Sequence, residues 1–166
     1  MIKLEKISPP KLDKNIQPVQ LTDTTMATRK AELLTKMQKE NYDAVVIYAD
    51  LEHGGNFEYF TGFVPRFEEA LLVIHQCGEA YLVLGNENLN KVPFARIKAK
   101  GIHMPHFSLP NQPMETTLTV PEILKQTKLE QADRIGLIGW KNFTSQHEDN
   151  ALIYDLPYFL IEGLKQ

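Results

Sequence analysis

Two uninterrupted apolar runs constrain the fold of this 166-residue chain more than any other feature. They occupy residues 44–49 and 70–74, and their length is that of a strand, not a helix. A strand that is apolar at every position is buried on both faces, as in the centre of an α/β sheet that has helices on either side. The sequence therefore predicts an α/β fold with these two segments as central strands.

Periodicity and turn residues place the remaining elements. A helix is expected over 25–41, with Thr24, Thr25 or Thr28 as its N-cap and Asn41 as its stop. Strands over 70–75 and 79–84 flank a turn-length link, so they form an antiparallel hairpin within a mixed sheet. The other expected elements are helices over 56–61, 88–99 and 122–129, strands over 101–107 and 134–140, and a last apolar piece over 154–164.

The chain is expected to divide into an arm and one domain. Residues 1–24 are polar and punctuated by Pro9, Pro10 and Pro18, which favours an extended N-terminal arm. Residues 25–166 form the domain, which is large enough to fold around a single core without disulfides. The arm is expected to lie over the domain and to dock through its apolar side chains, Ile2, Leu4, Ile7 and Leu12.

Composition excludes several classes of function. The net charge of −3 argues against a nucleic-acid partner, which usually requires a basic face. The single cysteine, Cys77, permits no disulfide within the chain, which fits a reducing compartment. The N-terminus has no apolar region typical of a secretory signal, and the apolar runs are far shorter than a membrane span. We expect a cytoplasmic protein without a membrane partner.

The loop between the two apolar runs holds most of the residues capable of chemistry. In open α/β sheets, ligands bind beside the carboxyl ends of strands, where this loop begins. Its acids suggest a metal-dependent nuclease site, although only Asp50 and Glu52 clearly follow a strand, and solvated loop acids are the simpler interpretation. The acids considered are Asp43, Asp50, Glu52, Glu58, Glu68 and Glu69.

Other catalytic patterns are weak. The pair Gly54-Gly55 lacks the residues of a phosphate-binding loop. His103 and His106 are separated by a spacing that does not suit a zinc site, and Cys77 lies in a turn. We therefore assign no catalytic residue, no metal ligand and no cofactor to this chain.

Aromatic side chains are unusually dense in the same loop. Some of them can fill the core beside the strands, but aromatic and arginine side chains are also enriched in contact surfaces. Both interpretations, core and ligand or partner surface, remain open from the residues alone. The residues concerned are Phe57, Tyr59, Phe60, Phe63 and Phe67, together with Arg66.

The ordered motif in this loop resembles a known family. The pattern is Glu52-His53-x-x-Asn56-x-x-Tyr59-x-Thr61-Gly62-Phe63, followed by Arg66-Phe67-Glu68-Glu69-Ala70-Leu71-Leu72-Val73. It is similar to the amino-terminal domain of the creatinase/prolidase/Xaa-Pro aminopeptidase family, the pita-bread metallopeptidases, over about residues 25–165. The resemblance implies a three-layer α/β/α domain with a mixed, ribonuclease-H-like sheet.

The same resemblance implies a function that this chain performs without hydrolysis of its own. A separate carboxy-terminal domain, absent here, would hold two divalent metals (Mn, Co or Zn). This domain would contribute to a homodimer and help to close the substrate pocket of the partner subunit in a cytoplasmic Xaa-Pro aminopeptidase or dipeptidase acting on peptides. The alternative is a catalytically inactive peptide- or protein-binding module of the same fold. The residues that the resemblance assigns to substrate gating are Tyr59, Arg66, Phe67, His53 and Phe63.

Overall fold

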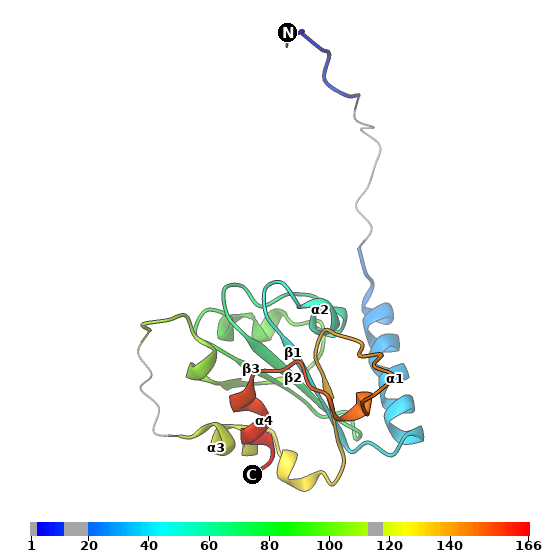
Figure 1. Cartoon of the computed structure of the whole chain (residues 1–166), viewed down its shortest axis with the longest axis vertical. Helices are drawn as coiled ribbons and strands as arrows, with labels where there is room; N and C mark the ends of the chain where they lie inside the picture. Colours follow the sequence, from blue (N-terminus) through cyan, green and yellow to red (C-terminus); the bar gives the residue numbers. More distant parts are fainter. Residues whose placement is uncertain (1–2, 12–19, 113–117) are drawn as a thin grey trace.

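The computed structural model describes residues 3–11, 20–112 and 118–166 (Figure 1). Its centre is a five-stranded sheet in the order β4-β3-β2-β1-β5. The strands are β1 Ala44–Ala49, β2 Ala70–His75, β3 Ala80–Leu84, β4 Lys100–His103 and β5 Ile135–Ile138. The helices are α1 Asp23–Lys39, α2 Gly55–Thr61, α3 Val120–Lys125 and α4 Tyr158–Leu164, with the short 3-10 helices η1 Leu89–Phe94, η2 Pro105–Phe107, η3 Leu129–Gln131 and η4 Asn150–Leu152.

The sheet is mixed, as the sequence predicts. β1 and β2 are antiparallel, and so are β2 and β3, which confirms the predicted hairpin. β1 and β5 are parallel, as are β3 and β4. This pattern of directions brings the carboxyl ends of β1, β3, β4 and β5 and the start of β2 to one end of the sheet.

The central strands separate two apolar cores, and this confirms the three-layer α/β/α prediction. Successive side chains of a strand point to opposite faces, so β1 contributes to both cores. One core lies between the sheet and helices α3 and α4, through residues such as Ile123 and Leu160. The other lies between the sheet and helices α1 and α2, through residues such as Met37 and Phe57.

The first helix begins and ends close to the predicted positions but with a different cap. The side chain of Thr22 accepts a hydrogen bond from the backbone N–H of Thr25, so Thr22 is the N-cap and the prediction of Thr24, Thr25 or Thr28 is wrong. Asn41 has a φ of 57°, a left-handed conformation that cannot continue a helix. It is therefore part of the stop that the sequence predicts.

Three other elements are shorter than predicted, for local reasons. The helix expected over 88–99 is only η1, because Pro93 supplies no backbone N–H and Ala95 is already extended. The strand expected over 101–107 ends at His103, and Pro105 starts η2. The helix expected over 122–129 is α3, which a capping box of Thr119 and Glu122 begins earlier, at Val120.

The described part of the N-terminal arm does not dock as expected. Leu4 and Ile7 are exposed at 103% and 81%, so the prediction that they contact the domain is wrong. The other two predicted docking residues, Ile2 and Leu12, lie outside the described residues. None of the described helices combines the length and the apolar character needed to cross a membrane.

Phe57 tests the packing of the core beneath α1 and α2, because its side chain is fully buried. Phe57→Ala should lower the free energy of unfolding by about 3–5 kcal/mol, through lost apolar contact and the cavity that remains. Urea unfolding followed by circular dichroism measures the change. The control is Phe94→Ala, which removes the same side chain at an exposed position and should change stability by less than about 0.5 kcal/mol. Equal losses in the two variants would contradict the assignment of this core.

Candidate functional site

Most of the predicted site residues lie in loops at one end of the sheet. The pairing register aligns Ala49 with Ala70, Ala70 with Leu84, and Leu84 with His103. The loops that follow β1, β3 and β5 therefore meet the loop that precedes β2. The candidate functional site consists of these loops.

A buried carboxylate anchors the loop that precedes β2. Glu68 is only 4% exposed and accepts hydrogen bonds from the backbone N–H groups of Glu87 and Asn88, at 2.9 and 3.2 Å. The Asn88 side chain also donates to Glu68, at 2.8 Å. A Cβ atom at Gly85 would come within 2.7 Å of this carboxylate, so the close approach requires glycine there. Glu68 thus joins the loop before β2 to the loop after β3.

Asn88, in the loop after β3, completes the anchor. Its side chain accepts from the backbone N–H of Arg66 at 3.0 Å and donates to the Arg66 carbonyl at 3.1 Å. Asn88 is fully buried, so these hydrogen bonds are sheltered from water. Arg66 is consequently held by its backbone, and its side chain remains free to project from the surface.

Phe67 is held in a conformation that an aromatic residue rarely adopts. Its φ is 66°, in the left-handed region, and its side chain is 56% exposed. The guanidinium of Arg66 lies 4.7 Å from the centre of the Phe67 ring, a cation–π arrangement. A large apolar side chain kept in water by a strained backbone is a feature that clusters at functional sites. The Arg66–Phe67 pair is therefore the strongest candidate in the site for contact with a ligand or partner.

His53, in the loop that follows β1, lies in a second part of the site, against the loop that follows β5. Its ring Nδ1 is 3.0 Å from the Asp50 carboxylate, and its ring stacks on that of Trp140 with the centroids 4.2 Å apart. Asp50 also accepts from the backbone N–H groups of Glu52 and His53, at 2.9 and 2.7 Å. Partial burial works to raise the pKa of Asp50, but these hydrogen bonds from His53 and Glu52 outweigh it and lower the pKa.

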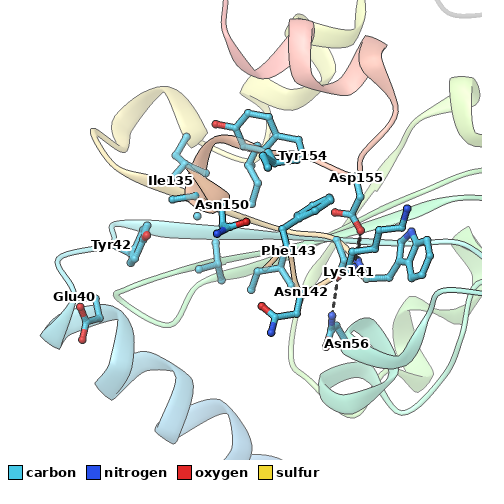
Figure 2. A pocket seen from close by; sticks show the side chains of 18 of the residues that line it. Glu40, Tyr42, Asn56, Ile135, Lys141, Asn142, Phe143, Asn150, Tyr154 and Asp155 are labelled. Carbon is cyan, nitrogen blue, oxygen red and sulfur yellow. Dashed lines mark hydrogen bonds between the residues drawn. The ribbon is translucent and has the colours of Figure 1, made fainter. Parts of the chain in front are cut away.

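Polar contacts connect the loop after β5 to the rest of this end (Figure 2). Asn56 donates from its side chain to the carbonyl of Gly139 at 2.7 Å. Asp155 accepts from the backbone N–H groups of Trp140 and Lys141, both at 2.7 Å. The turn that carries Trp140 is thus held from two sides.

Tyr48, which is buried, and Glu69, which is partly buried, form a pair near Asp50. The Tyr48 hydroxyl donates to Glu69 at 2.6 Å. Burial raises the pKa of Glu69, the hydrogen bond from Tyr48 lowers it, and the nearby charge of Asp50 raises it, with a net shift upward. Burial and the neighbouring Glu69 carboxylate likewise raise the pKa of the Tyr48 hydroxyl. The pKa of each group is therefore raised above its ordinary value.

The five predicted gating residues do not form one cluster. Tyr59 faces α1, where the Arg29 guanidinium lies 3.9 Å from its ring centre and donates to its carbonyl at 2.8 Å. Phe63 is half-buried and packs edge-to-face on Phe57, with the ring centroids 5.3 Å apart. Its position supports the core interpretation of the aromatic run, whereas Phe67 supports the contact-surface interpretation.

The solvated side chains that the sequence favours are found for only some of the loop acids, since Glu52 and Glu58 are exposed. Glu68 is buried, and Asp50 closes a turn through its hydrogen bonds. Asp43 accepts from the backbone N–H groups of Asp133 and Arg134, at 3.0 and 2.8 Å. Within residues 3–11, 20–112 and 118–166, no group of three or more His, Cys, Asp or Glu side chains is placed to hold a metal ion.

Sequence reasoning missed three residues that build the site. Asn88, Trp140 and Asp155 lie far from the motif-bearing loop, and their roles depend on the sheet order that brings β3 and β5 beside it. A signal existed for Trp140, the single tryptophan of the chain, because it lies two residues after the apolar run of β5 ends at Ile138. Asn88 and Asp155 carry no such signal, since asparagine and aspartate are common in loops.

Comparison with known proteins supports the fold. No family model matches the chain, and no curated protein is similar to it in sequence. A prolidase from Pyrococcus furiosus superposes with a TM-score of 0.50 at 15% identity, over 82% of this chain and 31% of the prolidase. A Streptococcus pyogenes Xaa-Pro aminopeptidase superposes with a TM-score of 0.49 at 15% identity, over 70% of this chain and 75% of the aminopeptidase. The creatinase/prolidase-like N-terminal domain of a Corynebacterium diphtheriae metallopeptidase gives a TM-score of 0.41 at 13% identity, over 68% of this chain and 94% of that domain.

The prolidase likeness confirms the resemblance at the level of the fold. The chain has the α/β/α architecture of a region that makes up about a third of that prolidase. At 15% identity, the likeness leaves the roles of individual side chains to the geometry described above.

The buried hydrogen bonds of Glu68 predict that replacing this one residue lowers the free energy of unfolding substantially. Glu68→Ala removes the acceptor of three buried or half-buried N–H groups and should lower the free energy of unfolding by about 2 kcal/mol or more. Glu52→Ala is the control, because this exposed side chain makes no such contact and its loss should cost less than about 0.5 kcal/mol. Chemical denaturation measures both, and equal costs would contradict the anchor.

The raised pKa of Glu69 predicts that the stability of the fold depends on pH. Because its pKa is raised in the folded state, its contribution to stability is complete below the ordinary glutamate range and is lost as the pH rises through the raised value. Glu69→Gln keeps an acceptor for the Tyr48 hydroxyl but cannot ionise. The stability of the variant relative to the parent should therefore increase as the pH rises from the ordinary glutamate range through the raised pKa of Glu69. An NMR titration that places the Glu69 pKa at or below its ordinary value would contradict this.

Proposed function

We propose that this chain is the non-catalytic amino-terminal domain of a metal-dependent Xaa-Pro aminopeptidase or dipeptidase. In this role it contributes to dimerisation and helps to close the substrate pocket of the partner subunit. The observation that carries the proposal is the Arg66–Phe67 pair, exposed at the loop end of the sheet on a backbone that Glu68 and Asn88 hold rigid. The shared fold with a prolidase region supports the same function.

The physical contribution of such a pair is to exclude water and to orient a peptide. An aromatic ring over the mouth of a pocket removes solvent from the reacting groups, and a guanidinium binds carbonyl or carboxylate oxygens of the peptide. Because the loop is anchored before the substrate arrives, little conformational entropy is lost on closing. His53, stacked on Trp140 at the same end of the sheet, would form a second contact beside the pair.

The chemistry itself would belong to a separate carboxy-terminal domain. Two divalent metals, Mn, Co or Zn, would activate water there, while this domain binds no metal. Residues 25–166 would form the docking unit, residues 1–24 would act as an arm, and the assembly would work in the cytoplasm. Tyr59 and Phe63, which pack against α1 and the core, would support the loop without touching the substrate.

The test uses the protein that contains this domain together with its metal half. Arg66→Ala and Phe67→Ala should each lower kcat/KM for an Xaa-Pro peptide by about tenfold, or about 1.4 kcal/mol of transition-state stabilisation. Metal content should stay unchanged, because neither residue is a ligand. Cys77→Ala is the matched control, since this exposed residue lies in the turn at the opposite end of the sheet and should leave the kinetics intact.

Two outcomes would contradict the proposal in different ways. Unchanged kinetics in both variants would remove the gating role while leaving the enzyme identity in place. Failure of the whole protein to bind metal or to hydrolyse any Xaa-Pro peptide would favour the alternative, an inactive peptide- or protein-binding module of the same fold.

A further inference from the structure

A groove of about 770 Å³ runs along β5, at the edge of the sheet (Figure 2). Its floor is the strand itself, from Ile135 to Gly139. One wall is the C-terminal half of α1, and the other is formed by residues 140–143 and 150–155. This groove is separate from the Arg66–Phe67 pair, and neither residue of the pair lines it.

The floor of the groove presents backbone hydrogen-bonding groups that have no partner among the described residues. In a parallel ladder, alternate residues of a strand bond to the neighbour, and the others direct their N–H and C=O groups outward. Among the described residues, the backbone of Ile135–Ile138 bonds to β1 and to nothing else. This row of outward backbone groups ends at Gly139, whose carbonyl accepts a hydrogen bond from the Asn56 side chain. About four residues, or roughly 13 Å of strand, are therefore available for pairing.

The walls of the groove select the shape of the occupant. The four β5 residues are half-buried, so the edge is recessed between its walls. Another folded sheet would have to displace α1 or the 150–155 segment to reach it, whereas a single extended chain fits between them. Apolar and aromatic side chains line part of the walls, beside polar ones such as Asn142 and Asn150; the apolar and aromatic ones include Leu33, Met37, Tyr42, Phe143, Ile153 and Tyr154.

We propose that the β5 edge binds an extended peptide segment as a sixth strand of the sheet. Main-chain hydrogen bonds to β5 supply the affinity, and the walls receive alternate side chains of the peptide. The site requires apolar side chains at alternate positions and does not depend on the function proposed above.

Opposite charges at the two ends of the groove orient the peptide. The Glu40 side chain lies at the end where β5 starts, and Lys141 lies at the other end (Figure 2). Neither forms an ion pair within the described residues. The Lys141 ammonium lies 4.6 Å from the ring centre of Trp140, and Lys36 and Asp155 also line the groove. Near Glu40, the Arg134 guanidinium is occupied, since it donates to the Glu40 carbonyl and lies 4.4 Å from the ring centre of Tyr42. A peptide that runs parallel to β5, with a basic residue first and an acidic residue last, complements both ends.

The first experiment selects peptides for the full 166-residue chain from a displayed library of random dodecapeptides. The enriched sequences should alternate apolar and polar residues, with a basic residue before the alternation and an acidic residue after it. Trp140, which lines the groove and is the single tryptophan, reports binding of the synthetic peptide through its fluorescence. Recovery of no common pattern would overturn the proposal.

Methylation of the peptide backbone gives the decisive comparison, because only one edge of a bound strand faces β5. Two versions of the selected peptide carry N-methyl groups at alternate residues, one version on each edge. One version should lose at least about tenfold in affinity and the other should bind as before. Hydrogen exchange at the amides of Ile135–Ile138 should slow in the complex. Equal binding of both methylated versions would overturn strand addition.

Charge reversal tests the orientation. Lys141→Glu should lower the affinity for the selected peptide several-fold. It should raise the affinity for a peptide whose terminal charges are exchanged. Lys39→Glu, on α1 but outside the groove, is the matched control and should change neither affinity. Protection of the β5 amides that rises with protein concentration in the absence of peptide would assign this edge to self-association and overturn the proposal.

Discussion

Burial of β1 on both faces is the constraint on which the rest of the structure depends. All six residues of β1 are buried, so the strand needs a helical layer on either side and a strand on either edge. α1 and α2 supply one layer, and α3 and α4 supply the other. Because β2 runs antiparallel to β1 and β5 runs parallel to it, the same arrangement brings the loops of the candidate site to one end.

At that end, buried residues stabilise the loop, and their neighbours in sequence and space are exposed. Glu68 and Asn88 turn inward and are almost fully buried, and together they hold the backbone on which Arg66 and Phe67 project outward. The positive φ of Phe67 costs free energy, which the buried hydrogen bonds offset. A loop without this anchor would relax the strain and bury the ring. The exposure of the Phe67 ring therefore depends on the buried hydrogen bonds of Glu68 and Asn88.

The sequence predicts the parts of the structure that depend on local pattern. The strands β1 and β2, the hairpin to β3 and the short helix α2 follow from apolar runs and turn residues, and the family resemblance adds the three layers. Partners that are distant in sequence are not predictable in this way. Thr22 competes with several nearby threonines as a cap, and Asn88 and Asp155 meet their loops only after β3 and β5 take their places. The resemblance also grouped Tyr59 with Phe67, although Tyr59 faces α1.

The two edges of the sheet differ in a way that bears on binding. At one edge, β4 carries Lys100, whose side chain is 66% exposed, and η1 lies beside Gly101 through Val92. Charge and cover of this kind protect an edge strand from pairing with other chains. At the other edge, the β5 sequence Ile-Gly-Leu-Ile has no charge and no proline. Among the described residues, one edge is thus protected and the other is left open inside a groove, which is the arrangement expected when an edge is kept for a strand-shaped ligand.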